Sequence, residues 1–359
     1  MHIQPHMVMA DAQGNIFDDP DLLMVCRRGE QWGLPRPDEL MPLPEESELF
    51  LLPGRQAVGL DPESGEIVSC DSMQIYRGME IGTAKPTAEE MDGVPHHLLG
   101  FLDPAKTFSA ADYTALAGKA IRDIASRGKR PLLVGGTGLY ARALLRGTSF
   151  SEKGRDEAVR QALEAELAAG GIGPLYARLQ SLDPEAAAQI HPNNTKRVIR
   201  ALEYCQAAGE PFSAQAKTAN AAAPPYDYVM LCLACRDREK LYARINARVD
   251  AMLQAGLLDE AERYFRQYGV SGRTSVQAIG YKELLPYFEG RCTLDEAVEA
   301  IKRETRRYAK RQLTWFRREE NTVWLYTDDY PDAAALTEAA LRIAEAHFSA
   351  GSDERKCAR

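Results

Sequence analysis

The feature that most constrains the fold is an alternation of strand, helix and strand patterns in the first half of the chain. Residues 67–71 form a short strand pattern that ends in a polar loop, residues 109–127 have helical periodicity, and residues 131–134 form an apolar run. This order is typical of a parallel α/β sheet. Because ligands bind such sheets beyond the carboxyl ends of the strands, we expect functional residues at Asp71 and at 135–137, where the two strand patterns end.

The rest of the chain divides into segments that differ in composition and in secondary-structure pattern. Residues 1–65 hold twelve acids, four arginines and eight of the twenty prolines, which predicts only short strands and turns. Helix patterns alone fill the middle of the chain, and strand and helix patterns then return. We therefore expect an atypical N-terminal segment at 1–65 and a first part of the α/β core at 66–150. A helical insertion domain at 151–225, a second core part with basic helices at 226–350 and a disordered tail at 351–359 would follow.

Composition narrows the class of protein. Outside residues 1–65 the chain carries 40 basic and 40 acidic residues, so its net charge of −8 comes from the N-terminal segment. A neutral body can bind nucleic acid where its bases cluster. We find no apolar run of membrane-spanning length and no signal-peptide pattern. We expect a cytoplasmic protein with reduced cysteines and no metal site at the lone pair Cys232 and Cys235.

Asp71 opens a polar segment, 71–79, that is continued by 81–86. A carboxylate at the end of a strand can accept a proton or hold a cation. It can equally cap the turn that follows the strand, and the spacing leaves both interpretations open.

A glycine-rich segment follows the apolar run at 131–134, from Gly135 to Tyr140. Glycines let the backbone approach a ligand closely, and a helix that begins there offers N–H groups to an anion. A tight turn from strand to helix needs the same glycines, so this segment is also open to two interpretations.

Basic residues gather in two places. Lys196, Arg197 and Arg200 form one cluster, and residues 302–318 hold eight bases against one acid, Glu304. Positions 303, 307, 310, 311 and 314 share one helix face, and Trp315 and Phe316 add stacking surfaces. Because like charges on one helix repel each other unless an anion compensates them, we favour contact with a polyanion over a merely solvated face.

Taken in order, these motifs resemble those of the bacterial tRNA dimethylallyltransferases. The match runs from about Glu66 to Trp324, and five ordered motifs make it highly specific. The residues that carry it are Cys70-Asp71-Ser72-Met73-Gln74-Ile75-Tyr76 with Gly82-Thr83-Ala84-Lys85-Pro86, Gly135-Gly136-Thr137-Gly138-Leu139-Tyr140, His191-Pro192-Asn193-Asn194 with 196–203, Ile279-Gly280-Tyr281-Lys282-Glu283, and 307–317.

The resemblance implies a P-loop NTPase-like core and a prenyltransferase reaction. A dimethylallyl group would pass from dimethylallyl diphosphate to the exocyclic amine of the adenosine 3′ to the anticodon, flipped out of the RNA. By resemblance, Asp71 takes the proton from this amine, and Arg238 supports the diphosphate with Lys310 and Arg311. Positions matching tRNA contacts are Asp71, Ser72, Met73, Gln74, Thr137, Arg160, Lys196, Arg197, Val198, Ile199, Arg200, Gln277, Ala278, Ile279, Gly280, Tyr281 and Lys282.

The same resemblance implies the partners of the protein. They are a tRNA anticodon stem-loop and dimethylallyl diphosphate, with Mg²⁺ as the cofactor that helps the diphosphate to leave. We expect a monomer that has no contact with a membrane.

The N-terminal segment departs from the family pattern. Family members have a strand and a Walker A-type loop, G-x-x-x-x-G-K-[ST], upstream of the Asp71 motif, and this pattern is absent from the chain. Residues 49–52 could imitate a strand, but 55–65 contain no Gly-Lys-Thr and are too few for the following helix. We expect the first strand and the P-loop to be replaced by a segment foreign to the family, which would impair catalysis.

Two alternatives remain. One is a catalytically dead remnant that still binds tRNA. The other is a nucleotide kinase-like enzyme, against which both the absent loop and the tRNA motifs argue.

Overall fold

The structure, a computed structural model, describes residues 65–148, 154, 156–214, 225–270, 274–320 and 322–357, and the backbone of two strands at 22–25 and 47–52. The chain forms two compact units. One comprises residues 1–144 and 225–359, and the other comprises residues 145–224. Each unit is described by itself.

The first unit is built on a seven-stranded sheet with the order β4-β3-β5-β2-β1-β6-β7. Neighbouring strands are parallel, apart from the antiparallel pair β1 and β6. The predicted parallel α/β sheet is therefore confirmed. The strands are β1 Leu22–Val25, β2 Ser47–Leu52, β3 Gly65–Ser69, β4 His96–His97, β5 Arg130–Val134, β6 Tyr226–Ala234 and β7 Thr322–Tyr326.

Strand β2 corrects one expectation from the sequence. We expected the first strand of the sheet to be lost, yet β2 lies in the middle of the sheet and pairs in parallel with β5. The register places Phe50 opposite Leu132 and Leu52 opposite Val134. Residues 53–64, where a phosphate-binding loop would follow this strand, lie outside the described residues.

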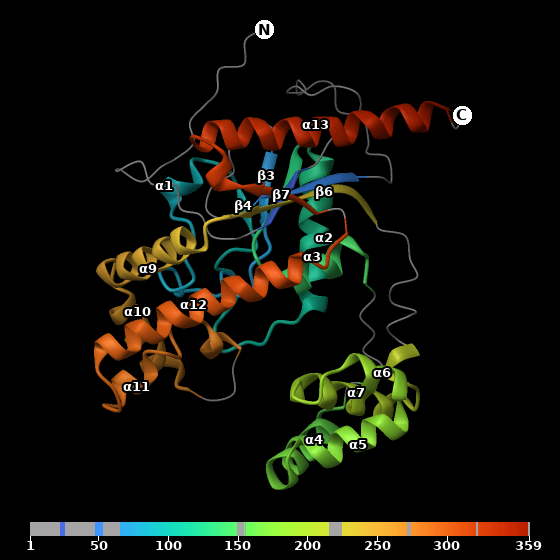
Figure 1. Cartoon of the computed structure of the whole chain (residues 1–359), viewed down its shortest axis with the longest axis vertical. Coiled ribbons are helices and arrows are strands. Elements are labelled where there is room, and N and C mark those ends of the chain that lie inside the picture. Colours follow the sequence, from blue (N-terminus) through green and yellow to red (C-terminus); the bar gives the residue numbers. More distant parts are fainter. Residues whose placement is uncertain are drawn as a thin grey trace. The chain divides into compact units, whose positions relative to one another are not determined.

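Helices α2 and α13 pack on the sheet of the first unit. Helix α2, Ala110–Ser126, begins at a capping box in which Ser109 and Asp112 satisfy each other's backbone N–H groups. It packs against β3 and β5. Helix α13, Ala333–Cys357, lies against β6 (Figure 1). It continues to Cys357, past the position where we expected a disordered tail to begin.

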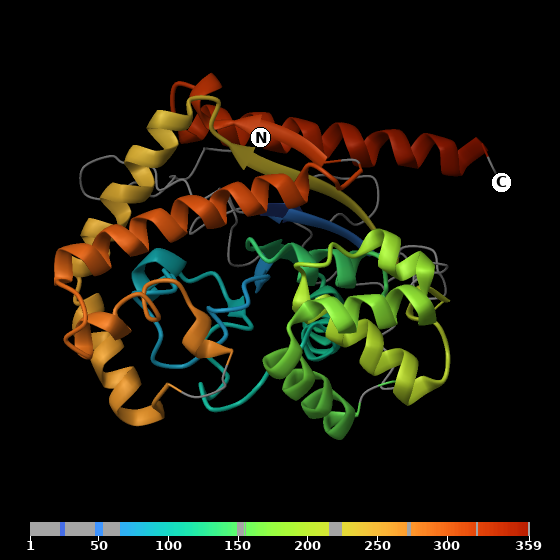
Figure 2. The same cartoon turned by 60° about the horizontal axis from the view of Figure 1, so that its bottom comes forward.

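Four helices of this unit, α9 Arg238–Gln254, α10 Leu257–Tyr268, α11 Leu285–Phe288 and α12 Leu294–Phe316, contribute to a second apolar core. Tyr76, Tyr264, Tyr281 and Ile301 are buried in it, and α9 and α12 lie side by side (Figure 2). The other elements of the unit are α1 Ala88–Met91 and α3 Gly138–Leu145, with 3₁₀ turns at Ser275–Gln277 and Thr327–Asp329.

The second unit is helical in its described part. It contains α4 Glu157–Gly170, α5 Ile172–Leu182, α6 Pro184–Gln189 and α7 Thr195–Ala208. Asp156, Asp183 and Asn194 accept hydrogen bonds from the first turns of α4, α6 and α7. Across the described parts of both units, no helix combines the length and the apolar character needed to cross a membrane.

Candidate active site

The loop after β3 holds Asp71 at the carboxyl end of the sheet. The Asp71 Oδ1 accepts hydrogen bonds from the backbone N–H groups of Met73 at 2.7 Å and Gln74 at 3.0 Å. The side chain is half-buried and lines a cavity. Asp71 therefore combines both features considered from the sequence, because one oxygen caps the turn while the residue forms part of the cavity wall.

The glycine-rich loop after β5 lies against the start of this turn. The backbone N–H of Thr137 donates to the Cys70 carbonyl at 3.0 Å, and the Thr137 hydroxyl accepts from the Ser72 N–H at 2.9 Å. Gly135 has a φ of 151°, and a Cβ there would lie 2.4 Å from the Cys70 carbonyl carbon. Only glycine allows the two loops to approach so closely, so this motif fixes the Asp71 turn from behind.

The cavity beside Asp71 has a volume of about 260 Å³. Its walls come from the loop after β3, from α9, from the segment around Gly280 and from α12. The lining residues are Asp71, Ser72, Met73, Gly82, Thr83, Ala84, Arg248, Val249, Met252, Gln277, Ala278, Ile279, Gly280, Lys282, Ile301, Thr305, Tyr308 and Arg311. The structure thus brings together two motifs that lie about 200 residues apart in the sequence.

The charges on the cavity wall are unequal. Asp71 is the one carboxylate among the lining residues, whereas Arg248, Lys282 and Arg311 are cations. Arg311 lies over the ring of Tyr308, 5.7 Å from its centroid. An anionic group that entered the cavity would therefore find cations on several walls.

Sequence reasoning missed several lining residues, including Arg248, Met252, Thr305 and Tyr308. Arg248 and Met252 are four residues apart on α9, so helical spacing places them on one face. Nothing in that spacing indicates that the face meets the Asp71 loop, because this contact depends on how α9 packs.

Five of the expected site residues in the first unit do not line the cavity. Gln74 instead donates to the carbonyls of the 83–84 loop, Thr137 holds the Asp71 turn, and Tyr281 is buried in the second core. Arg238 donates to the Tyr242 hydroxyl at 2.8 Å. The fifth, Lys310, is exposed on α12.

The structure narrows the expected tRNA contacts of the helical unit. Val198 and Ile199 are buried in its core, so their side chains offer no surface to RNA. The guanidinium groups of Arg160 and Arg200 lie 2.8 and 3.1 Å from the buried carboxylate of Glu203. Lys196 and Arg197 are exposed.

Helix α12 presents the basic face that its sequence predicted. Positions 303, 307, 310, 311 and 314 are all exposed. Toward the beginning of the cluster, Lys302 pairs with Asp250 at 2.7 Å and Arg307 pairs with Glu304 at 2.6 Å.

The two aromatic residues of α12 correct our expectation of free stacking surfaces. Phe316 is buried in the core. Trp315 packs on α3, since Arg142 lies 4.2 Å from its ring centroid and a Cβ at Gly138 would lie 2.3 Å from the ring. Both residues therefore pack within the first unit.

The described residues contain no cluster of three histidine, cysteine, aspartate or glutamate side chains that could hold a metal ion. Magnesium usually keeps several waters and binds through one or two carboxylates together with substrate phosphates. The single carboxylate of the cavity wall, Asp71, fits that mode but not a dedicated protein cage.

Comparison with known proteins gives a consistent result. The family model described as IPP transferase matches residues 74–319. A tRNA dimethylallyltransferase of Halalkalibacterium halodurans is 46% identical over 320 residues, which cover 87% of this chain and 99% of the relative. One from Bacillus subtilis is 50% identical over 261 residues, 73% of this chain and 82% of the relative.

Solved structures with similar folds have similar descriptions. A full-length tRNA isopentenylpyrophosphate transferase from Bacillus halodurans matches with a TM-score of 0.58 and 44% identity, over 81% of this chain and 91% of that one. A eukaryotic dimethylallyltransferase acting on tRNA matches with a TM-score of 0.68 and 28% identity, over 79% and 73% of the two chains.

The match to the Halalkalibacterium halodurans relative also includes part of the N-terminal segment. Coverage of 87% is about 312 residues of this chain, more than the 294 residues after Gly65. The match therefore extends into the segment 1–65, which we expected to be foreign. Gly54 and Gly59 have the spacing of the two loop glycines, but Leu60 and Asp61 follow them in place of Lys and Ser or Thr.

Proposed function

This chain belongs to the IPP transferase family, and on that premise we propose that it transfers a dimethylallyl group from dimethylallyl diphosphate to the exocyclic amine of the adenosine 3′ to the anticodon of tRNA. The observation that carries the proposal is the placement of Asp71 on the wall of a cavity together with the 277–282 segment. A volume of about 260 Å³ is just below the roughly 300–1,000 Å³ of small-molecule sites, which suits a single flipped base better than a whole nucleotide.

The proposed step needs one proton acceptor and one stabilised leaving group. The amine nitrogen forms a bond to the allylic carbon while the bond from that carbon to the diphosphate oxygen breaks. Asp71 takes the amine proton, and the diphosphate leaves with the electron pair. The turn that anchors Asp71 Oδ1 would hold the Asp71 carboxylate in place, which general-base catalysis requires.

Cations and a metal ion would stabilise the departing diphosphate. Arg248, Lys282 and Arg311 line the cavity, and Arg238 at the start of α9 donates to the Tyr242 hydroxyl. Mg²⁺ would be held chiefly by phosphate oxygens and water and would neutralise charge on the diphosphate, while Asp71 remains the proton acceptor.

We further propose that transfer by this chain is slow. The sequence at 54–61 has the two glycines but not the lysine and hydroxyl that family members provide for phosphate and magnesium. Loss of one preorganised donor can lower a rate by about 10²–10³. The alternative that this feature favours is a remnant that binds tRNA without modifying it.

One assay separates these outcomes. Labelled dimethylallyl diphosphate and an anticodon stem-loop are incubated with the chain as it stands, and with a variant whose residues 1–65 are replaced by a family-type strand, loop and helix. We expect binding by both proteins and robust transfer by the variant alone. Transfer by neither supports the remnant, and absence of stem-loop binding at low salt contradicts both readings, since phosphate contacts should dominate affinity.

A further inference from the structure

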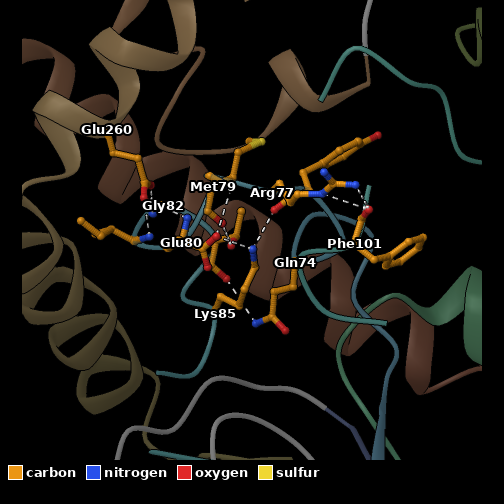
Figure 3. Close-up of polar contacts among 12 residues, drawn as sticks. Gln74, Arg77, Met79, Glu80, Gly82, Lys85, Phe101 and Glu260 are labelled. Atoms are coloured by element: carbon orange, nitrogen blue, oxygen red, sulfur yellow. Dashed lines mark hydrogen bonds and ion pairs between the residues drawn. The ribbon is translucent and has the colours of Figure 1, made fainter. Parts of the chain in front are cut away.

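A buried carboxylate contacts the loop that forms one wall of the cavity. Glu260 on α10 is 4% exposed. Its Oε2 accepts the backbone N–H groups of Glu80 at 2.9 Å and Ile81 at 3.0 Å, and its Oε1 accepts the N–H of Gly82 at 2.9 Å and the hydroxyl of Tyr281 at 2.6 Å. Figure 3 shows the carboxylate facing the backbone of this loop.

These four donors belong to two walls of the cavity. Gly82 and the next two residues line one wall, and Gln277, Ala278, Ile279, Gly280 and Lys282 line another. Tyr281 lies within the second segment but points away from the cavity into the core. Its ring fits against Gly82, where a Cβ would lie 2.4 Å from the ring. The two walls thus meet at one contact, and Glu260 bonds both sides of it.

Hydrogen bonds also connect the loop that Glu260 binds to the Asp71 turn. The buried Lys85 donates to the Tyr76 carbonyl at 2.7 Å and to Glu80 Oε1 at 2.9 Å. Gln74, which also donates its N–H to Asp71, contacts the Thr83 carbonyl through its side chain at 3.2 Å. A shift of the loop at Glu260 would therefore be transmitted to the Asp71 turn.

The hydrogen-bond donors around Glu260 explain why a carboxylate occupies this buried position. Its four donors are neutral groups, and a buried charge held only by neutral donors is costly. A carboxylate can nevertheless accept all four hydrogen bonds, whereas the NH₂ of an amide would face a donor. Burial and the nearby Glu260 charge raise the pKa of Tyr281 well above its usual range, so this hydroxyl remains a donor at physiological pH.

We propose that Glu260 is a positioning residue that couples the two walls of the cavity and so fixes how the incoming base lies against Asp71. The effect on transfer rests on the function proposed above, whereas the coupling of the walls does not. A displacement of about 1 Å at such a site can lower a rate about 10²-fold.

The test uses Glu260→Gln, Tyr281→Phe and a matched control, Asp183→Asn. Asp183 is a buried carboxylate in the helical unit that accepts two backbone N–H groups and the Ser213 hydroxyl. Amide hydrogen exchange is measured at 80–82 and 278–282 in the full chain. Single-turnover transfer and stem-loop affinity are measured for the same substitutions in the protein with its loop restored.

In Glu260→Gln we expect exchange to rise at least about tenfold in both walls, and transfer to fall about 10–100-fold with stem-loop affinity within about threefold. Tyr281→Phe, which keeps the ring and the three backbone bonds, should lose about three- to tenfold in rate. It also serves if Glu260→Gln does not fold. Asp183→Asn should reduce thermal stability without lowering the transfer rate at saturating substrate.

Three results would overturn the inference: exchange that rises in only one wall of Glu260→Gln, a transfer rate unchanged in Tyr281→Phe, or an equal loss of rate in Asp183→Asn. If the loop-restored parent transfers nothing, the proposed function fails. The exchange measurement then still decides whether Glu260 couples the walls.

Discussion

Strand β3 has a carboxylate at each end, and the two are held in different ways. Glu66, the second residue of the strand, is 2% exposed and contacts Arg127, His97 and Lys129. The hydrogen bond from Arg127 is the main cause that lowers the pKa of Glu66 to about 2. Asp71, two residues past the other end, is half-buried and is anchored by the backbone N–H groups of its own turn.

The difference separates a charge that stabilises the fold from one that can act on a ligand. Cations of the chain itself surround Glu66, so its carboxylate is committed to them. Asp71 accepts the backbone N–H groups of its own turn and lines a cavity wall, a position from which a carboxylate can accept a proton from a bound ligand. Four predictions sharpen or break this contrast.

The largest effect is expected for Asp71→Asn. The amide oxygen can still accept the two N–H groups of the turn, but the amide cannot act as a base, so transfer should fall about 10²–10⁴-fold. Single-turnover assays in the protein with a restored loop measure this, and stem-loop affinity should stay within a few-fold. Full activity of the variant would make Asp71 a structural cap and would remove the contrast with Glu66.

Glu66 should instead govern stability at low pH. Its pKa lies below the usual 4.5, so the stabilisation is present above about pH 4.5 and is lost as the pH falls toward about 2. The shift corresponds to about 3 kcal/mol, reduced to about 2–3 because Arg127 is partly exposed. Urea unfolding as a function of pH should show this loss in the parent protein and a flatter profile in Glu66→Gln, whose transfer rate should remain near that of the parent.

The same distinction applies to cations in the helical unit. Arg160→Ala removes a partner of the buried Glu203 and should lower the free energy of unfolding by about 1–2 kcal/mol, after allowance for the exposed side of the arginine. The salt dependence of stem-loop binding should barely change. A clear decrease in its slope would show that Arg160 contacts phosphate despite this ion pair.

Lys310→Ala should have the smallest effect, and in contrast to Arg160→Ala it should change stem-loop binding and leave stability unchanged. Lys310 is exposed on α12 and forms no ion pair with any residue that the structure describes. Its removal should leave stability within about 0.5 kcal/mol. If it contacts a phosphate, the slope of log affinity against log salt should fall by about one. An unchanged slope would assign it to the solvated face.

Local patterns in the sequence were sufficient for much of the fold. The helix at 109–127, the strand at 131–134 and the basic face of α12 were each predicted from neighbouring residues. Periodicity and caps depend on interactions within a few residues, so one sequence can specify them. The order of the motifs along the chain can also be read from one sequence, and it was enough to identify the family.

Tertiary structure alone decided which residues form the cavity and which support it. Arg248 lines the same cavity as Asp71, Glu260 binds residues 178 to 180 positions away, and Phe316 is buried rather than free to stack. Strand β2 lies centrally although its sequence gave only a weak signal. The reason is physical: a glutamate on an amphipathic helix has the same local pattern whether water or a distant loop satisfies it, and only the packed chain determines which one it meets.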